Sequence, residues 1–498
     1  MRDKEPSKLR AHDIAERVNS GKWTTLDVAE VFAKKTENLH RLLNTHIYWD
    51  MDLALRQAEI QHDYNLAALK SGKRLPLAGV PFVIKDNIVI KNSITTCGSK
   101  YLESFRSPYS ATAVERLMAA GALVLGKSNL DEFGMGSTNE FSHFGPVANP
   151  WNTAHVPGGS SGGSAAAVSA SMATCALGSD TGGSVRQPAS FCGIVGLKPS
   201  YGRVSRYGLV AYASSLDQIG PMAKSCLDAA LVYDVISGFD PLDATSVKKD
   251  VMSAVSAIKS LQAESLKGWR IGVIEELLDA DLQPEVSKAI KQSIQTLTDL
   301  GAQIKKISIP SIKFAVSSYY LIATAEASSN LSRFDGVRYG YSSQSSGASL
   351  RDLYTSSRSE GFGPEVKKRI MLGAFSLSSG YYDAYYNKAL HVRSLITKEI
   401  DRSFEDVDIM LLPTAATTAF PKGSKTNDSL AMYTSDLFTI LANLGGFPAI
   451  SLPCGYDDNR LPIGLQLMAP RFAETALFQC AYQYEQATKW VEKHEPKC

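Results

Sequence analysis

Apolar residues recur at intervals of three and four in some parts of the chain and form short unbroken runs in others. The first spacing predicts amphipathic helices and the second predicts buried strands. Near the start of the chain the spacing predicts three helices, in which Thr24 or Thr25 is placed to cap the second: Leu9 to Val18, Leu26 to Leu43 and Leu53 to Lys70. They form the N-terminal helical segment, residues 1–72.

The same two patterns then alternate. A strand at Gly79 to Ile84, a helix at Ala113 to Ala120 and a strand at Ala122 to Leu125 form a β-α-β unit, which implies a largely parallel sheet with helices on its faces. Further helices are predicted at Ser225 to Ile236, Pro284 to Leu300, Asp436 to Asn443 and Glu474 to Lys489. Further strands are predicted at Trp269 to Ile274, Ile304 to Ile309, Asp408 to Leu412, Ala449 to Leu452 and Gly464 to Met468. No internal repeat or linker interrupts them, so we predict one α/β domain, residues 1–498, with a mixed, mostly parallel, twisted sheet.

Charge and cysteine content narrow the class of protein. The 498 residues hold 52 Lys and Arg against 50 Asp and Glu, a formal charge of +2 that gives no basic surface for nucleic acid. The seven cysteines form no C-x-x-C pair, and their odd number argues against a full disulfide framework. The N-terminus is too charged for a signal peptide, and no apolar run approaches ~18 residues. We expect a soluble cytoplasmic protein with reduced thiols and no membrane contact.

Two glycine-rich turns lie close together between Val156 and Ala189. They read V-P-G-G-S-S-G-G-S and G-S-D-T-G-G-S-V-R-Q-P, and a helix-forming run of Ala, Ser and Val follows the first. Glycine leaves backbone N–H groups uncovered, so these turns predict a surface of free amides and serine hydroxyls, as acyl transfer requires. A flexible linker is the first alternative, but the helix-forming run argues against it. A phosphate nest is the second, but neither turn carries a lysine in the Walker position.

The segment Gly121 to Ser128 matches the written P-loop pattern G-x-x-x-x-G-K-[ST]. A P-loop needs a polar, glycine-rich loop between a strand and a helix. Here the intervening residues are themselves a predicted strand, whose amides are committed to a sheet. We therefore reject ATP binding by this motif.

The two turns, with a lysine at the end of an earlier strand, resemble the amidase-signature family. The lysine is Lys85 in V-P-F-V-I-K-D-N, and the signature core spans residues 75–225. The resemblance implies that Ser184 attacks the amide carbon, and that Ser160, next to a cis peptide, relays a proton between Ser184 and Lys85. It also implies that backbone amides form the oxyanion hole, those of Thr181, Gly182, Gly183 and Ser184.

This chemistry sets conditions on the lysine. An amine accepts a proton only when it is neutral, so burial must lower the pKa of Lys85 from ~10.4 toward ~7–8. Asp86 follows Lys85 directly, but successive residues of a strand point to opposite faces, so the two need not pair. The alternatives are a histidine base at His143 or His155 and a thiol nucleophile at Cys192, which we place in an apolar, strand-like run.

Residues 319–388, rich in Tyr, Ser and Gly, resemble one subfamily: the glutaminase subunits of tRNA-dependent amidotransferases. The resemblance implies a pocket, within residues 310–400 and beyond, in which Arg369 binds the α-carboxylate of glutamine, Asp436 binds its ammonium group and Tyr320 lines the wall. Ordinary ion pairs are the alternative for the two charged residues.

The subfamily also implies the partners. The chain would form a heterotrimer with two further subunits and supply ammonia for Gln-tRNA(Gln) or Asn-tRNA(Asn). A partner subunit would use ATP and Mg²⁺ and bind most of the misacylated tRNA, while this chain carries no cofactor or metal. A stand-alone amidase for small aliphatic or aryl amides is the alternative function, and a non-enzymatic scaffold with a decayed site is a third possibility.

Overall fold

The computed structural model describes residues 6–261, 265–278, 281–344, 349–426, 428–496 and 498. The described residues form one ten-stranded sheet, in the order β2-β1-β3-β5-β4-β9-β10-β8-β6-β7. The strands are β1 (Pro81–Lys85), β2 (Leu123–Ser128), β3 (Cys175–Asp180), β4 (Val195–Lys198), β5 (Gln218–Ala223), β6 (Arg270–Ile274), β7 (Gln303–Ile307), β8 (Ile409–Pro413), β9 (Ala449–Tyr456) and β10 (Pro462–Met468).

The sheet is mixed, as predicted, and its parallel pairs lie at the two edges. β1 runs parallel to β2 and β3, and β6 runs parallel to β7 and β8. The strands between these edges pair antiparallel, from β3 through β5, β4, β9 and β10 to β8. The β-α-β spacing of the sequence therefore predicts the edges, whereas the antiparallel centre is a finding of the structure.

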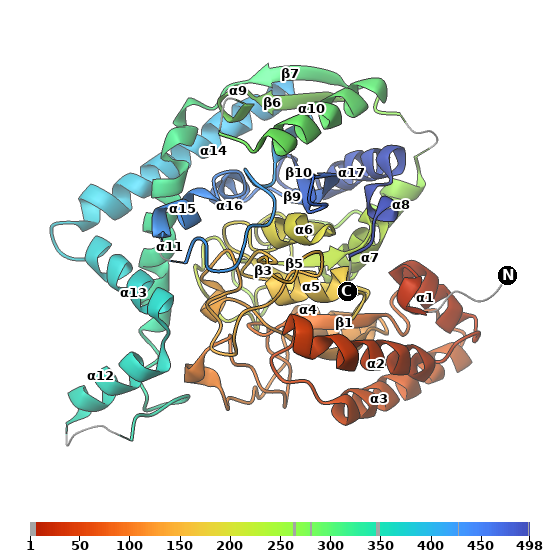
Figure 1. The fold of residues 1–498 in the computed structure, drawn as a ribbon, viewed down its shortest axis with the longest axis horizontal. Coiled ribbons are helices and arrows are strands. Elements are labelled where there is room, and N and C mark those ends of the chain that lie inside the picture. Colours follow the sequence, from red (N-terminus) through yellow and green to blue (C-terminus); the bar gives the residue numbers. More distant parts are fainter. Residues whose placement is uncertain (1–5, 262–264, 279–280, 345–348, 427, 497) are drawn as a thin grey trace.

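Helices cover both faces of this sheet (Figure 1). In β1, Phe82 and Ile84 pack in one apolar cluster, whereas Val83 packs with α5 in another, on the opposite face. Both faces of β1 are therefore buried, which explains its unbroken apolar sequence. The helices before residue 280 are α1 (Ala11–Asn19), α2 (Thr25–Leu43), α3 (Met51–Lys70), α4 (Thr112–Ala119), α5 (Gly162–Ser169), α6 (Arg186–Cys192), α7 (Cys226–Ile236), α8 (Ala254–Lys259) and α9 (Glu275–Leu278).

The later helices are α10 (Pro284–Asp299), α11 (Ala315–Leu331), α12 (Leu350–Gly361), α13 (Pro364–Ser376), α14 (Lys388–Asp406), α15 (Ser429–Thr434), α16 (Ile440–Gly445), α17 (Glu474–Thr488) and α18 (Trp490–Lys493). Single-turn helices or a π-helical turn lie at Pro6–Lys8, Lys100–Leu102, Glu132–Gly134, Pro310–Phe314 and Tyr382–Asn387. Figure 1 shows α1 to α3 together at one end of the molecule and α12 and α13 at the other.

Local sequence signals explain most boundaries. Thr24 caps α2, because its side chain accepts a hydrogen bond from the amide of Asp27 at 3.1 Å. Two predictions are wrong in detail. Asp436 precedes α16 instead of lying in a helix, since its carboxylate is used for other contacts. Cys192 ends helix α6 instead of lying in a strand, because the chain turns at Gly193, which has a left-handed φ of 68°.

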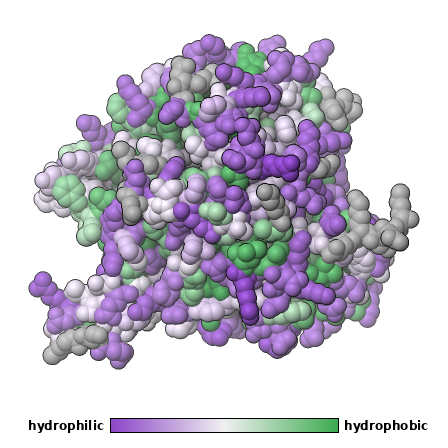
Figure 2. Space-filling model, in the orientation of Figure 1, coloured by the Kyte–Doolittle hydropathy of each residue, from purple (hydrophilic) through white to green (hydrophobic). Residues whose placement is uncertain are grey.

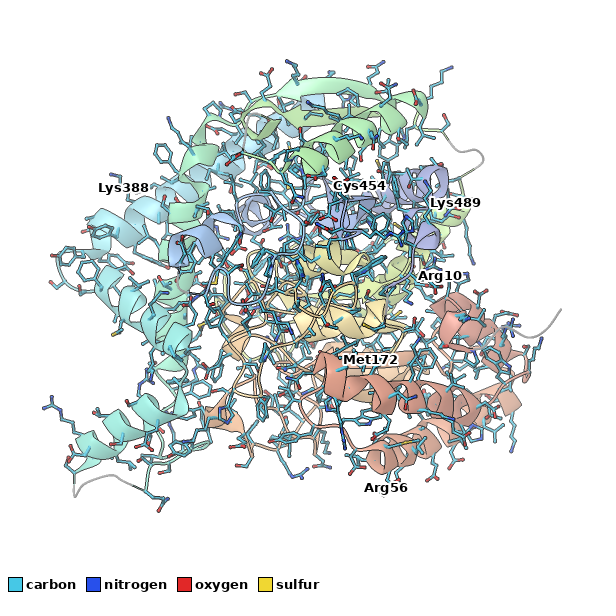
Figure 3. The ribbon with its side chains drawn as sticks, viewed as in Figure 1. Arg10, Arg56, Met172, Lys388, Cys454 and Lys489 are labelled. Carbon is cyan, nitrogen blue, oxygen red and sulfur yellow. The ribbon has the colours of Figure 1, made fainter. Side chains whose placement is uncertain are left out.

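The interior is densely filled (Figure 3). Met172 and Cys454 are buried within it, whereas Arg56 and Lys388 are exposed. Arg10 and Lys489, from the first and last parts of the chain, line one hollow on the surface. The face in Figure 2 is mostly hydrophilic, with scattered apolar residues. Within the described residues, no helix combines the length and apolar character that crossing a membrane requires.

Candidate active site

The amine of Lys85 contacts the hydroxyl of Ser160 in the interior of the protein. Lys85 is the last residue of β1 and is 0% exposed. Its Nζ donates to Ser160 Oγ at 2.7 Å and to the carbonyl oxygen of Ser179 at 3.2 Å. The structure thus brings together two of the three residues that the amidase-signature motifs single out, although they lie 75 positions apart in the sequence.

Burial decides the charge of this amine. It lowers the pKa of Lys85 to about 7, although the negative charges of Asp131, Asp180 and Asp217 act in the opposite direction. Neither hydrogen-bond partner of Nζ is charged. A large fraction of Lys85 is therefore neutral near pH 7, as a proton acceptor must be.

Asp86 points away from Lys85 and pairs with another lysine. Its Oδ1 lies 2.6 Å from Lys127 Nζ, and its Oδ2 accepts hydrogen bonds from the amide and hydroxyl of Thr96. Lys127 belongs to the P-loop-like pattern, whose intervening residues form β2. The lysine that would face a phosphate in a P-loop is instead held in a buried ion pair, which agrees with our rejection of that motif.

The first glycine-rich turn leads into α5 and carries Ser160. The peptide bond between Gly159 and Ser160 is cis. The side chains of α5 are small and all buried, so the helix lies close against the sheet. Ser161, at the start of α5, donates from its amide to the carbonyl oxygen of Ser184 at 3.1 Å. This bond joins the two glycine-rich turns directly.

The second turn presents Ser184, which is 8% exposed. Asp180, at the end of β3, accepts from the amides of Gly183 at 2.8 Å and Val185 at 3.1 Å. The Gly183 amide is therefore committed to Asp180, which differs from the oxyanion role inferred from the sequence. The amides of Thr181, Gly182 and Ser184 remain as candidate donors.

The Gly183 position itself requires glycine. Its φ is +128°, and a Cβ there would lie 2.2 Å from Thr439 Oγ1. Thr439 in turn donates to the carbonyl oxygen of Gly182 at 2.6 Å. Ser160 Oγ and Ser184 Oγ share no hydrogen bond in the described structure, so a proton relay between them requires one side chain to rotate.

Arg186 connects this turn to the C-terminal part of the chain, and the sequence analysis did not identify it. It is 0% exposed and donates to Asp180, to Asn443 Oδ1 at 2.6 Å and to Gln466 Oε1 at 2.6 Å. Although burial raises the pKa of Asp180, Arg186 and the other donors hold it well below its usual range. The buried ion pair thus fixes the backbone from which Ser184 projects.

The residues predicted to bind an amino acid form a buried group near this turn. Arg369, on α13, is 2% exposed and donates to Glu365 Oε1 at 2.9 Å and to Tyr212 OH at 2.7 Å. Its third nitrogen, Nη2, is buried and has no hydrogen-bond partner among the described residues. Buried guanidinium nitrogens are normally hydrogen-bonded, so the arginine has capacity for one more acceptor.

Asp436 and Arg369 both contact Tyr320. Asp436 is 7% exposed, and its carboxylate accepts from Tyr320 OH at 2.7 Å and from Ser137 Oγ at 2.9 Å. The guanidinium of Arg369 lies 5.5 Å from the centre of the Tyr320 ring. Burial raises the pKa of Asp436 to about 6, against these hydrogen bonds, so the group is still mostly ionised at pH 7.

Four residues of this group were missed by the sequence analysis. Ser137 follows two glycines in G-M-G-S, which is a usable signal of an exposed turn. Tyr212, Glu365 and Tyr433 carry no such signal. Tyr433 stacks on Tyr320 with ring centres 3.9 Å apart, and its hydroxyl donates to Glu365 at 3.0 Å.

The alternative catalytic groups lie elsewhere. The ring of His143 packs edge-on against Phe144, and burial lowers the pKa of His155. Neither histidine donates to or accepts from Ser160 or Ser184 in the described structure. The Cys192 Sγ lies 3.4 Å from the carbonyl oxygen of Pro157, and burial raises its pKa, which disfavours the thiolate.

Comparison with known proteins agrees with this arrangement. The family model described as Amidase matches residues 27–478. The chain belongs to the Amidase family. It is 50% identical over 479 residues to a protein of Halothermothrix orenii, the A-type subunit of Glutamyl-tRNA(Gln) amidotransferase by name, covering 96% of this chain and 97% of that one.

Solved structures give the same result for the fold. The crystal structure of the A-type subunit of Glutamyl-tRNA(Gln) amidotransferase from Thermotoga maritima is 40% identical, with a TM-score of 0.79 over 98% of this chain and 96% of that one. A peptide amidase in complex with the inhibitor chymostatin is 30% identical, with a TM-score of 0.81 over 99% of both chains. The amidase fold is therefore common to both proteins, and choosing between their activities requires the residues around Arg369.

Proposed function

We propose that this chain is the glutamine-hydrolysing subunit of a tRNA-dependent amidotransferase. One observation carries the proposal: a buried arginine nitrogen, without a partner among the described residues, and a buried carboxylate lie against the same tyrosine. Glutamine has an α-carboxylate and an α-ammonium group, and Arg369 and Asp436 supply the opposite charge for each. A simple aliphatic amide would leave both charges uncompensated. The names of the relatives support the same activity.

The reaction begins with Lys85 neutral. A proton passes from Ser184 Oγ to Ser160 Oγ while the proton of Ser160 passes to Lys85 Nζ. Ser184 Oγ then bonds to the amide carbon of glutamine, and the carbonyl oxygen becomes an oxyanion. The amides of Thr181, Gly182 and Ser184 stabilise this charge, and each such donor contributes about 3 kcal/mol.

The proton then returns along the same route. Lys85 gives it to the departing nitrogen through Ser160, the carbon–nitrogen bond breaks, and ammonia leaves a glutamyl ester on Ser184. Water, deprotonated by the same amine, hydrolyses the ester and releases glutamate. Every proton that Lys85 accepts is thus returned within the cycle, so this chain needs no metal or redox cofactor.

The ammonia is delivered to a partner. The proposed complex is a heterotrimer, in which another subunit uses ATP and Mg²⁺ to activate Glu-tRNA(Gln), Asp-tRNA(Asn) or both and binds most of the tRNA. The formal charge of +2 on this chain is consistent with that division of roles. We propose no ATP, Mg²⁺ or tRNA site on this chain.

Substrate kinetics test the assignment. Arg369→Ala should lower kcat/KM for glutamine by ~100-fold, since a charge-assisted pair to the carboxylate is lost. It should leave hydrolysis of butyramide, which has no α-carboxylate, within about twofold. Arg338→Ala is the matched control, because Arg338 is an exposed arginine of the same region that pairs with Asp335. Hydrolysis of butyramide but not of glutamine by the unchanged chain would favour the stand-alone amidase.

Purification tests the assembly. When the chain is isolated at its native expression level, two further subunits should co-purify in equal amounts. An active single chain without partners would overturn the heterotrimer.

A further inference from the structure

Helix α13, which carries Arg369, begins at a residue that cannot cap it. Gly363 occupies the N-cap position and has no side chain. The first amides of a helix lack acceptors within the helix and are usually capped locally. Here the amide of Gly363 donates to Glu132 Oε2 at 2.8 Å, from a residue 231 positions earlier in the chain. A distant carboxylate thus holds the start of the helix.

Glu132 is itself fixed. It is 3% exposed, and its other oxygen, Oε1, accepts from Ser99 Oγ at 2.5 Å. Burial raises the pKa of Glu132 to about 7, although the bonds from Ser99 and Gly363 and the charge of Lys367 lower it. Because the carboxyl group is dry, water does not replace a hydrogen bond that is lost there.

The surroundings of Glu132 connect the two halves of the site. The preceding residue, Asp131, donates from its amide to the carbonyl oxygen of Ser160 at 3.3 Å. Phe133, on the other side of Glu132, packs against Phe362 with ring centres 5.6 Å apart, and Phe362 directly precedes Gly363. One short segment therefore contacts both the serine of the proposed relay and the start of α13.

We propose that Glu132 is a positioning residue for glutamine: it fixes the start of α13 so that Arg369 can reach the α-carboxylate of the substrate. The proposal rests on the proposed function. Arg369 lies in the second turn of α13, and its bond to Glu365 is within the same helix, so the guanidinium moves with the helix end. Glu132 contacts neither the scissile amide nor Ser184, and its effect should fall on recognition.

The contact can be disturbed from either side. A Cβ added to Gly363 would lie 2.4 Å from Glu132 Oε2, and Gly363 has an ordinary φ of −72° that alanine adopts without strain. Gly363→Ala therefore displaces the carboxylate while leaving its charge in place. Glu132→Ala removes the carboxylate, and Glu132→Gln keeps one oxygen that can accept from Gly363.

The test measures kcat and KM of the complete chain, with any subunits that co-purify, on glutamine and on butyramide. Glu132→Ala and Gly363→Ala should each raise KM for glutamine about tenfold, and Glu132→Gln should raise it less. Butyramide hydrolysis should stay within about twofold of the unchanged chain. The double variant Glu132→Ala/Gly363→Ala should be no worse than Glu132→Ala, because the added methyl group enters the space that the carboxylate vacates.

The chain offers a matched control in Glu485. Burial also raises the pKa of Glu485 to about 7, and its carboxylate likewise accepts from the first amide of a helix, that of Cys226 in α7, at 2.9 Å. α7 carries no residue of the proposed site. Glu485→Gln should therefore leave KM for glutamine unchanged.

The outcomes separate the two proposals. Unchanged KM for glutamine in Glu132→Ala would overturn the positioning role alone. So would an equal fall in the hydrolysis of both substrates, which would mark a general structural role. Butyramide turnover without glutamine hydrolysis by the unchanged chain would overturn the proposed function, and the role of Glu132 with it.

Discussion

Lowering the pH from 8 to 6 should suppress glutamine hydrolysis about tenfold. The reason is the amine of Lys85, whose pKa burial lowers to about 7. Only the neutral amine accepts the proton of the nucleophile. With that pKa, about 90% of Lys85 is neutral at pH 8 and about 10% at pH 6. Activity should therefore rise with pH through about 7 and level off above 8, and it should be lost on the acidic side.

The free energy behind this shift is large. The difference between the ordinary value of 10.5 and about 7 corresponds to about 5 kcal/mol against the charged form of Lys85. It comes mainly from the loss of water around the amine, because the nearby carboxylates act in the opposite direction. High salt should thus move the midpoint little, since a buried group is poorly screened.

The assay is initial-rate ammonia release from glutamine between pH 5.5 and 9, with each sample returned to pH 8 to confirm that the loss is reversible. Lys85→Arg is the matched control, because a guanidinium keeps the charge but cannot be deprotonated. Its residual rate should be low and independent of pH.

Two results would refute the reasoning. A rate that is flat from pH 6 to 8, with chemistry shown to limit turnover, would mean that Lys85 does not accept the proton. A midpoint that moves on replacing His143 or His155 would assign the acidic limb to a histidine instead.

Three further predictions concern the glycine-rich turns. Ser184→Ala should lower ammonia release by more than ~10⁴-fold, whereas His155→Ala should leave it nearly intact; the opposite pattern in the same assay would argue for a histidine mechanism. Arg186→Met should lower the free energy of unfolding in urea by about 3–5 kcal/mol, because a buried carboxylate loses its partner, and a change below about 1 kcal/mol would contradict this. Gly183→Ala should abolish hydrolysis because its Cβ would lie 2.2 Å from Thr439 Oγ1; a normal rate would show that the turn yields.

The structure bears out the elements whose apolar pattern is strong and local. The predicted bounds of helix α2 agree within one residue at its start and coincide at its end, because a capping threonine and regular apolar spacing mark it. The strand ending at Lys85 is predictable because it is a short apolar run with a charged end. The strands β3, β4 and β5 are not among the predicted ones. Each contains glycine, and β3 also ends in serine and aspartate, which hides the pattern.

By itself, the sequence determined the two glycine-rich turns, the buried lysine and the family to which they belong, since these depend on residues close together in the chain. Only the tertiary structure decided which distant residues meet. Tyr212 reaches Arg369 across 157 positions, and Glu132 reaches Gly363 across 231. Periodicity records which side of a segment is buried, but not which other segment buries it. That second choice follows from strand order and loop packing, which place the predicted residues in one site and the unpredicted ones around them.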